Sequence, residues 1–289
     1  MRPDNWHLTE DVDDLLARAG GFLRSRPALH TMPLTATETL RAGGTDTHAA
    51  EPPVFGRLET GGQVCAVFYR VPPRRLILTS LTPGQADALA AHLAGLGHPL
   101  PGVSADHQTA TAFAEAWQRH TGATPTLLHR LRLYRLGTLI PPQPSPEGRP
   151  RVAGEHDREQ LRLWCNGFAQ AVGQAPFADV ESWARRYAHK RFTFWETPDG
   201  TPVSIAGTTP LIAGQIRVDP VYTPTASRNA LNRLRSTSLP IQAKPLLGCS
   251  PSGMCTTASR MGDIVFVPYS AYGHVKSHAA GGLGAGGAW

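Results

Sequence analysis

The chain has 289 residues, of which 41% are apolar and 17% are charged, so it is long enough for two ordinary globular domains and is not composed like a disordered protein. Its net charge of +6 would suit a nucleic-acid binder. However, the pairs Arg74-Arg75 and Arg185-Arg186 stand alone, without interleaved aromatic residues, so we expect no nucleic-acid partner. No signal peptide is visible, and no apolar run approaches the ~18 residues of a membrane span. We therefore expect a cytoplasmic protein without a membrane partner.

The four cysteines are too few and too scattered for a disulfide framework. Cys249 and Cys255, taken with His274 and His278, superficially suggest zinc. Five residues separate the two cysteines, however, which exceeds the usual spacing of about two to four. We therefore expect no metal site.

Residues 1–139 carry signals for both helices and strands. An amphipathic helix is predicted with Thr9 as its N-cap, and the glycine pair at 20–21 is expected to end or interrupt it. A second helix start is marked by Thr82 as N-cap, Pro83 at the first helical position and Gln85 closing a capping box. The other predicted elements are strands at 64–69 and 76–78, a helix at 108–120 and a strand at 127–136.

A proline-rich segment at 140–150 is predicted to be a linker, and the signals after it are stronger. A short strand at 151–153 precedes a helix at 155–172, whose apolar side chains recur on one face. A further helix begins near Val180, with Asp179 as its N-cap. The turn Pro198-Asp199-Gly200 then joins two strands of a hairpin, and another strand runs from Gln215 toward Thr223.

The order β-α-α-β-β-β in residues 151–224, ending on Val-Tyr-Thr-Pro, indicates an α+β or mixed α/β fold. It resembles the front half of the GNAT superfamily of N-acetyltransferases. Arg151-Val152-Ala153 and the helix with Leu161, Trp164 and Phe168 resemble the first strand and helix of that family, and residues 216–224 resemble its fourth strand. The resemblance implies a mostly antiparallel central sheet flanked by helices, with residues 1–139 as a degenerate GNAT-like N-terminal lobe.

Pro220 interrupts the last of these strands. Because proline cannot donate to a sheet ladder, the strand is predicted to bulge or splay there. The resemblance implies that the bulge opens a V beside the fifth strand, in which the thioester of acetyl-CoA lies. Backbone N–H groups near Val221 and Tyr222 would hold the thioester carbonyl and the developing oxyanion. The resemblance also places Val218 and Thr223 in contact with acetyl-CoA.

Asp219 and Tyr222 are the expected catalytic residues. Asp219 is the one acid on this strand and would take the proton of a primary amine, directly or through water. The amine would belong to a small molecule or a peptide. A solvated strand acid or a turn ligand is the alternative for Asp219, and an ordinary core or groove aromatic is the alternative for Tyr222.

The resemblance ends after Pro224. The family has a basic residue there, followed by glycines and a helix whose first amides bind pyrophosphate. Here Arg228 is the corresponding basic residue and an expected acetyl-CoA contact, but no glycine follows until Gly248. Of the 22 acidic residues only Asp263 lies beyond residue 220, so residues 225–289 are predicted to be an atypical, poorly ordered tail with one strand at 264–267.

Two functions remain open from the sequence. The first is an N-acetyltransferase, and the second is a catalytically inactive remnant of one that serves as a binding module or has no function. The change in composition after residue 224 also suggests that the original C-terminal half was replaced, for instance by a frameshift. Sequencing the coding DNA tests this, since the idea fails if the other reading frame past codon 224 encodes no glycine-rich loop and no matching strand pattern.

Overall fold

The structure is a computed structural model. It describes residues 5–43, 51–97, 100–128 and 133–227 (except 139, 141–142, 144, 173 and 175), and the strands at 243–245, 263–266 and 273–278. The chain divides into two compact units: unit 1 comprises Met1–Arg132 and Tyr269–Trp289, and unit 2 comprises Leu133–Pro268. The first change of unit precedes the proline-rich segment at 140–150, and the second falls within residues 225–289.

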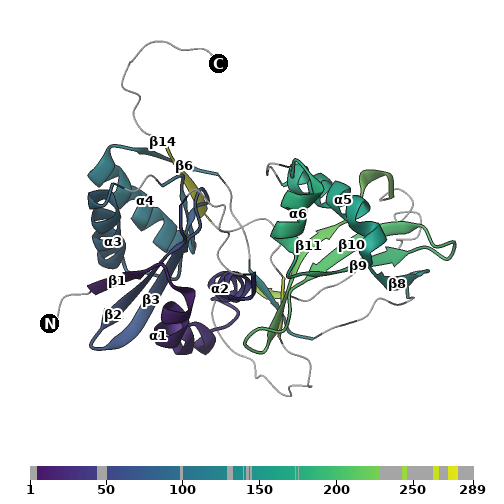
Figure 1. The fold of residues 1–289 in the computed structure, drawn as a ribbon, viewed down its shortest axis with the longest axis horizontal. Coiled ribbons are helices and arrows are strands. Elements are labelled where there is room, and N and C mark those ends of the chain that lie inside the picture. The colour runs from purple at the N-terminus through teal and green to yellow at the C-terminus, as the bar shows by residue number, and fades with distance from the viewer. Residues whose placement is uncertain are drawn as a thin grey trace, which may run out of the picture. The chain divides into compact units, whose positions relative to one another are not determined.

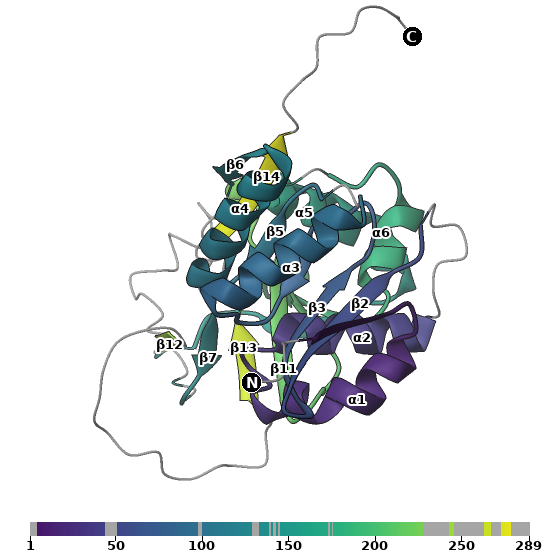
Figure 2. The same ribbon diagram turned by 90° about the vertical axis from the view of Figure 1, so that its left-hand side faces the viewer.

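Unit 1 contains one seven-stranded sheet with the strand order β1-β2-β3-β4-β5-β14-β6. Its elements are β1 (Asn5–Thr9), α1 (Val12–Ser25), α2 (Thr31–Gly43), β2 (Val54–Thr60), β3 (Gln63–Arg70), β4 (Leu76–Leu78), α3 (Pro83–Gly95), β5 (Val103–Ala105), α4 (His107–Thr121), β6 (Thr124–Leu127) and β14 (Gly273–His278). Only β4 and β5 pair in parallel, and the other neighbours are antiparallel. Figure 2 shows α3 and α4 side by side over this sheet, where Leu89, Phe113 and Phe68 share one core.

Unit 2 contains a second seven-stranded sheet, in the order β12-β7-β13-β11-β10-β9-β8. Its elements are β7 (Tyr134–Leu136), β8 (Arg149–Val152), the 3-10 helix η1 (Glu155–Asp157), α5 (Arg158–Ala171), α6 (Val180–Tyr187), β9 (Arg191–Glu196), β10 (Pro202–Thr208), β11 (Gln215–Tyr222), β12 (Ala243–Pro245) and β13 (Asp263–Phe266). Both α5 and α6 lie on one face of the sheet (Figure 1), where Cys165 and Trp183 pack against Phe194.

The two sheets have the same order of parallel and antiparallel pairs. In unit 2, β8-β9-β10-β11 are antiparallel neighbours, β11 pairs in parallel with β13, and β7 and β12 complete the sheet in antiparallel pairs. Unit 1 shows this sequence of directions from β1 to β6, with β5 in the place of β13 and β14 in the place of β7. In each sheet this strand pairs with strands that are remote from it in sequence: β14 pairs with β5 and β6, and β7 pairs with β12 and β13.

Several predicted elements are confirmed. The helix at 83–95 begins with the Thr82/Gln85 capping box, and Asp179 accepts a hydrogen bond from the Ser182 amide at the start of α6. The hairpin at residues 191–208 and the strand at 215–222 are also present. Together with the mostly antiparallel sheets and their flanking helices, these confirm the predicted α+β class.

Two predictions are wrong. The first helix is capped by Asp11 instead of Thr9, and it continues through the two glycines to Ser25. Leu15 and Leu23 are fully buried and stabilise the helix. Their burial outweighs the cost of placing the two glycines in a helix, which is about 1 kcal/mol each. The strand predicted at 127–136 is two strands, since β6 ends at Leu127 and β7 belongs to the other sheet.

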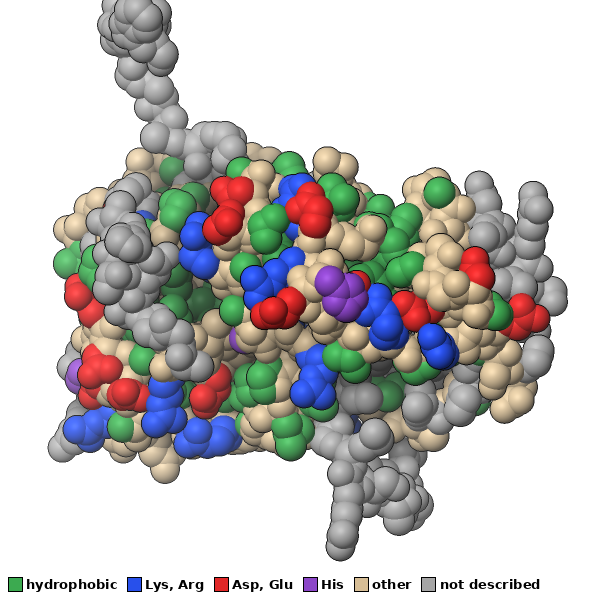
Figure 3. Space-filling view, turned by 45° about the vertical axis from the view of Figure 1, so that its right-hand side comes forward, with side chains coloured by type: hydrophobic (Ala, Val, Ile, Leu, Met, Phe, Trp, Pro, Cys, Tyr) green, Lys and Arg blue, Asp and Glu red, His purple; other side chains and the backbone are tan. Residues whose placement is uncertain are grey.

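Charged side chains of both signs lie on the face shown in Figure 3. In Figure 3, blue Lys and Arg side chains are interspersed with red Asp and Glu side chains. Arg119 lies 2.7 Å from Asp87 and Arg41 lies 3.0 Å from Asp13, so part of the positive charge is paired locally. No helix in the described part of the chain combines the length and apolar character that a bilayer span requires.

Candidate functional site

The strand β11 bulges at the point that Pro220 predicts. Val218 pairs with Thr208 and Val221 pairs with Ala206, so Asp219 and Pro220 together lie opposite a single residue of β10. That residue is Gly207, and a Cβ atom added to it would lie 3.0 Å from the carbonyl oxygen of Asp219. The predicted bulge is therefore confirmed, and it needs a glycine on the neighbouring strand because the two backbones approach closely.

On the side of β11 away from β10, the pairing with β13 ends at the same point. β13 pairs in parallel with β11 from Gln215 to Val218. Within the described residues, β11 has no further partner on that side, so the edge from Asp219 to Tyr222 is unpaired there. Alternate N–H and C=O groups of a strand point to each edge, and this segment can therefore offer backbone hydrogen bonds to a ligand.

Asp219 lies in an ion pair beneath the bulge. Its Oδ2 is 2.8 Å from Nζ of Lys190 and 3.9 Å from a guanidinium nitrogen of Arg217. The Lys190 ammonium also donates to the main-chain carbonyl oxygen of Asp219. Burial opposes ionisation of this carboxyl, but the charges of Lys190 and Arg217 outweigh burial and hold the pKa of Asp219 below its ordinary value. The carboxylate is therefore ionised at neutral pH and is a weak base.

Lys190 reaches Asp219 from the short connection between α6 and β9. Its side chain is only 2% exposed, and its ammonium lies 5.3 Å from the centre of the Tyr187 ring. Burial lowers the pKa of Lys190 to about 8, with Asp219 acting in the opposite direction. The ammonium therefore remains mostly protonated at neutral pH.

His189 precedes this lysine and is also enclosed. Both of its ring nitrogens are buried, and neither has a hydrogen-bond partner among the residues that the structure describes. Burial lowers the pKa of His189 to about 4, and the nearby charges of Lys190, Arg217 and Arg186 act in the same direction. The imidazole is therefore neutral near pH 7.

Tyr222 packs against the helix α5 at the other end of the bulged segment. A Cβ atom at Gly167 of α5 would lie 2.6 Å from the phenolic oxygen of Tyr222, so the ring fits over a position that has no side chain. Tyr222 also borders the apolar cluster around Cys165. Burial raises the pKa of the Cys165 thiol to about 11, so this cysteine is not a nucleophile at neutral pH.

The other residues that the sequence predicts to contact acetyl-CoA differ in their solvent exposure. The Val221 side chain is 54% exposed, and Val218 and Thr223 are half-buried. Arg228 lies outside the described residues. Asp219, Val221 and Tyr222 thus lie within one short segment of β11, at the bulge.

The sequence reasoning missed Lys190 and Gly167. A lysine between a helix and a strand has the same sequence pattern as any solvated lysine, and its partner Asp219 lies 29 residues further along the chain. Gly167 lies within an otherwise regular helical pattern, where an isolated glycine often has a packing reason.

At the equivalent point of unit 1, after β4 of the parallel pair β4 and β5, backbone amides are bonded to side chains. The amide of Leu81 donates to the hydroxyl of Thr109 at 2.9 Å, and that hydroxyl donates to Asp106 at 2.7 Å. Thr82 and Gln85 satisfy the first amides of α3. In this unit the amides of Leu81, Thr82 and Gln85, which follow the fourth strand, are therefore bonded to the chain's own side chains.

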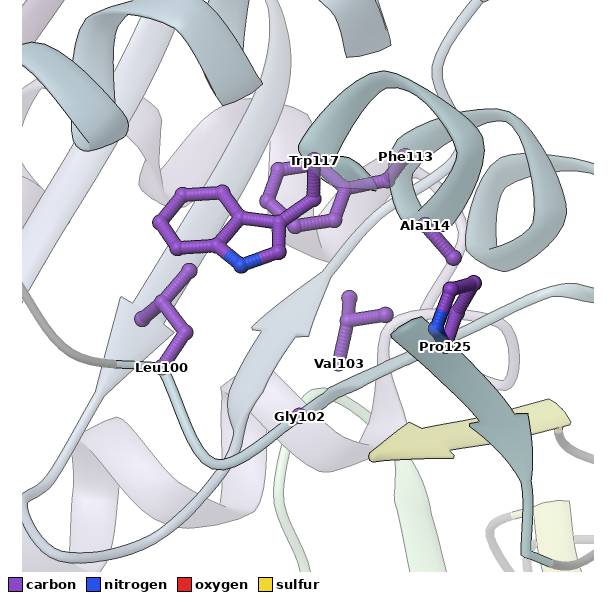
Figure 4. Close-up of a pocket in the computed structure, with 7 residues that line it drawn as sticks. All are labelled: Leu100, Gly102, Val103, Phe113, Ala114, Trp117 and Pro125. Carbon is purple, nitrogen blue, oxygen red and sulfur yellow. The ribbon is translucent and has the colours of Figure 1, made fainter. Parts of the chain in front are cut away.

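A small apolar hollow also lies in unit 1 (Figure 4). Its walls include Val103, Phe113 and Trp117, and no charged side chain lines it. The described residues contain no cluster of His, Cys, Asp and Glu that could hold a metal ion. The hollow offers no group for acid–base chemistry, and β11 of unit 2 is therefore the candidate site.

Comparison with solved structures identifies the fold. The chain is similar to the GCN5-related N-acetyltransferase from Sphaerobacter thermophilus, with a TM-score of 0.50, 12% identity and coverage of 96% of this chain and 97% of that one. It is also similar to an acetyltransferase of the GNAT family from Colwellia psychrerythraea, with a TM-score of 0.47, 9% identity and coverage of 94% and 98%. No protein-family model and no curated protein matches the sequence. The chain therefore has a GNAT acetyltransferase fold, as the sequence predicts.

Proposed function

We propose that the protein is an N-acyltransferase that binds acetyl-CoA along the edge of β11 and transfers its acetyl group to a primary amine of a small molecule or peptide. The observation that carries this proposal is the β11 edge from Asp219 to Tyr222, which begins at the bulge and has no strand partner among the described residues, within a GNAT fold. A thioester carbonyl placed there would accept a hydrogen bond from the backbone near Val221 and Tyr222. The same donors would stabilise the oxyanion that forms when the amine attacks.

The reaction breaks the thioester C–S bond as the amide C–N bond forms, and the amine loses one proton. Asp219 is ionised and 25% exposed, so it can accept that proton directly or through a water molecule. Its lowered pKa makes it a weak base, and the amine must therefore reach it already unprotonated. Tyr222 borders the same segment and would line the thioester.

Acetyl-CoA titration tests the proposal. We expect saturable binding to the intact chain, about tenfold weaker for Val221→Glu, which places a charge against the ligand. Leu211→Glu is the matched control, since Leu211 is 63% exposed and lies outside β11, and it should bind like the unaltered protein. Absence of saturable binding at millimolar acetyl-CoA would refute the enzyme hypothesis and favour an inactive remnant. Release of free CoA thiol with a panel of amines then identifies the acceptor.

A further inference from the structure

The bulge in β11 costs the strand some of its regular hydrogen bonds. Two residues, Asp219 and Pro220, lie opposite Gly207 alone, and Pro220 has no amide hydrogen to donate. The carbonyl oxygen of Asp219 instead accepts a hydrogen bond from the Lys190 ammonium. A side chain therefore bonds a main-chain group at the point where the strand departs from regular pairing.

Lys190 is held rigidly enough to fix this geometry. Its backbone amide donates to the carbonyl of Tyr187 at 2.8 Å, and its ammonium lies near the ring of the same tyrosine. The ammonium also pairs with Oδ2 of Asp219 at 2.8 Å, so it binds both the main chain and the side chain of one residue. With 2% exposure, this lysine has no alternative solvent-exposed position to occupy without repacking.

The register of the following residues depends on the bulge. A bulge adds one residue to β11, and in a strand a shift of one residue exchanges the two faces. With the bulge in place, Val221 is 54% exposed and Tyr222 packs over Gly167. Without it, Val221 and Tyr222 would exchange faces, and different backbone groups would lie along the unpaired edge.

We propose that Lys190 is a positioning residue for acyl-CoA, which fixes the bulge at Asp219–Pro220 and thereby holds the β11 edge in the register that binds the thioester. The proposal rests on the acyl-CoA site inferred above. Lys190 is buried and acts through Asp219 instead of touching the substrate.

Two variants separate positioning from simple stability. Lys190→Met removes the ammonium and leaves the Asp219 carboxylate without its cation, so it should lower the melting temperature. The double variant Lys190→Met/Asp219→Asn removes both charges and should regain most of that melting temperature. It still lacks the ammonium that binds the main-chain carbonyl, and we expect its Kd for acetyl-CoA to remain raised by about tenfold.

Amide hydrogen exchange of the ligand-free protein supplies a readout that does not depend on binding. In the double variant, whichever of the Val221 and Tyr222 amides donates to β10 should exchange faster, whereas the amide of Phe194 in β9, which does not adjoin β11, should not change. If the double variant keeps the original exchange rates, or binds acetyl-CoA as tightly as the unaltered protein, the role of Lys190 is overturned. If the unaltered protein does not bind acetyl-CoA, the proposed function fails, and the exchange data still show whether Lys190 fixes the bulge.

Discussion

His189 should make the protein less stable in mild acid. Its pKa lies at about 4 in the folded chain, against 6.5 for an ordinary histidine, because the buried ring has no partner for a second proton. Between these two values the unfolded chain binds more protons than the folded chain. The free energy of unfolding therefore falls as the pH drops below 6.5, and the loss is complete near pH 4.

The size of the effect follows from the two pKa values. Lowering the pH from 7 to 5 should remove about 2 kcal/mol through this one group. The substitution His189→Phe deletes the titrating ring while keeping an aromatic of similar shape. Carboxylates contribute to acid sensitivity in both proteins, so the difference between them isolates His189.

Urea unfolding at a series of pH values between 7 and 4.5 measures this difference. The unaltered protein should lose about 2 kcal/mol more than His189→Phe between pH 7 and pH 5. His107→Gln, which removes an exposed histidine, is the matched control and should follow the unaltered protein. Parallel stability curves for the unaltered protein and His189→Phe would show that the buried ring does not titrate as argued.

Three further substitutions test the packing of the two units, each by urea unfolding. Thr82→Ala removes the cap of α3 and should cost about 1 kcal/mol, and an unchanged midpoint would contradict the capping box. Arg151→Met removes the guanidinium that binds Glu196 at 2.5 Å and Asp157 at 2.7 Å, leaves Glu196 with Arg149 at 3.9 Å, and should cost about 1–3 kcal/mol. Adding Glu196→Gln should recover part of that loss, because Asp157 still lacks the Arg151 guanidinium. Gly56→Ala places a Cβ atom 2.0 Å from the ring of Phe68 and should cost about 1–3 kcal/mol, and retained stability would mean that β2 can shift.

The fold was most predictable where local and tertiary preferences agree. The capping residues Thr82 and Asp179 mark helix starts through hydrogen bonds made within three residues, so the sequence alone reveals them. The strand β2 was missed because Gly56, Arg57 and Glu59 interrupt its apolar pattern. Arg57 is tolerated there because it pairs with Glu59 at 2.8 Å.

Remote strand pairing was beyond sequence reasoning. The strand at 263–266 was predicted, but nothing in its residues indicates that it pairs in parallel with β11. The strand β14 was not predicted, and its partners β5 and β6 lie about 150 residues earlier in the chain. Such pairings form only when the whole sheet assembles, so no short sequence pattern predicts them.

The candidate site was predictable in its backbone and not in its electrostatics. Proline cannot donate to a ladder, and this rule sufficed to place the bulge at Pro220. The ion pair needed the tertiary structure, because Lys190 meets Asp219 only when the segment after α6 packs beneath β11. The pairing changes the chemistry expected of Asp219, since a carboxylate beside a buried ammonium is a weaker base than one in solvent.

The two units differ in the hydrogen bonds that their backbones can offer to a ligand at the same place in the sheet. Both have a parallel pair of strands at the same place in the sheet, so the topology alone does not favour either one. In unit 1 the amides that follow the fourth strand are already bonded. The amide of Leu81 donates to the hydroxyl of Thr109, and the amides of Thr82 and Gln85 take part in the capping box. In unit 2 the pairing with β13 ends at Val218 and leaves the next part of the β11 edge unpaired within the described residues, beside a partly exposed carboxylate. A ligand entering unit 1 at this point would have to break existing hydrogen bonds, whereas a ligand on β11 would add new ones, and acyl-CoA binding is therefore expected in unit 2.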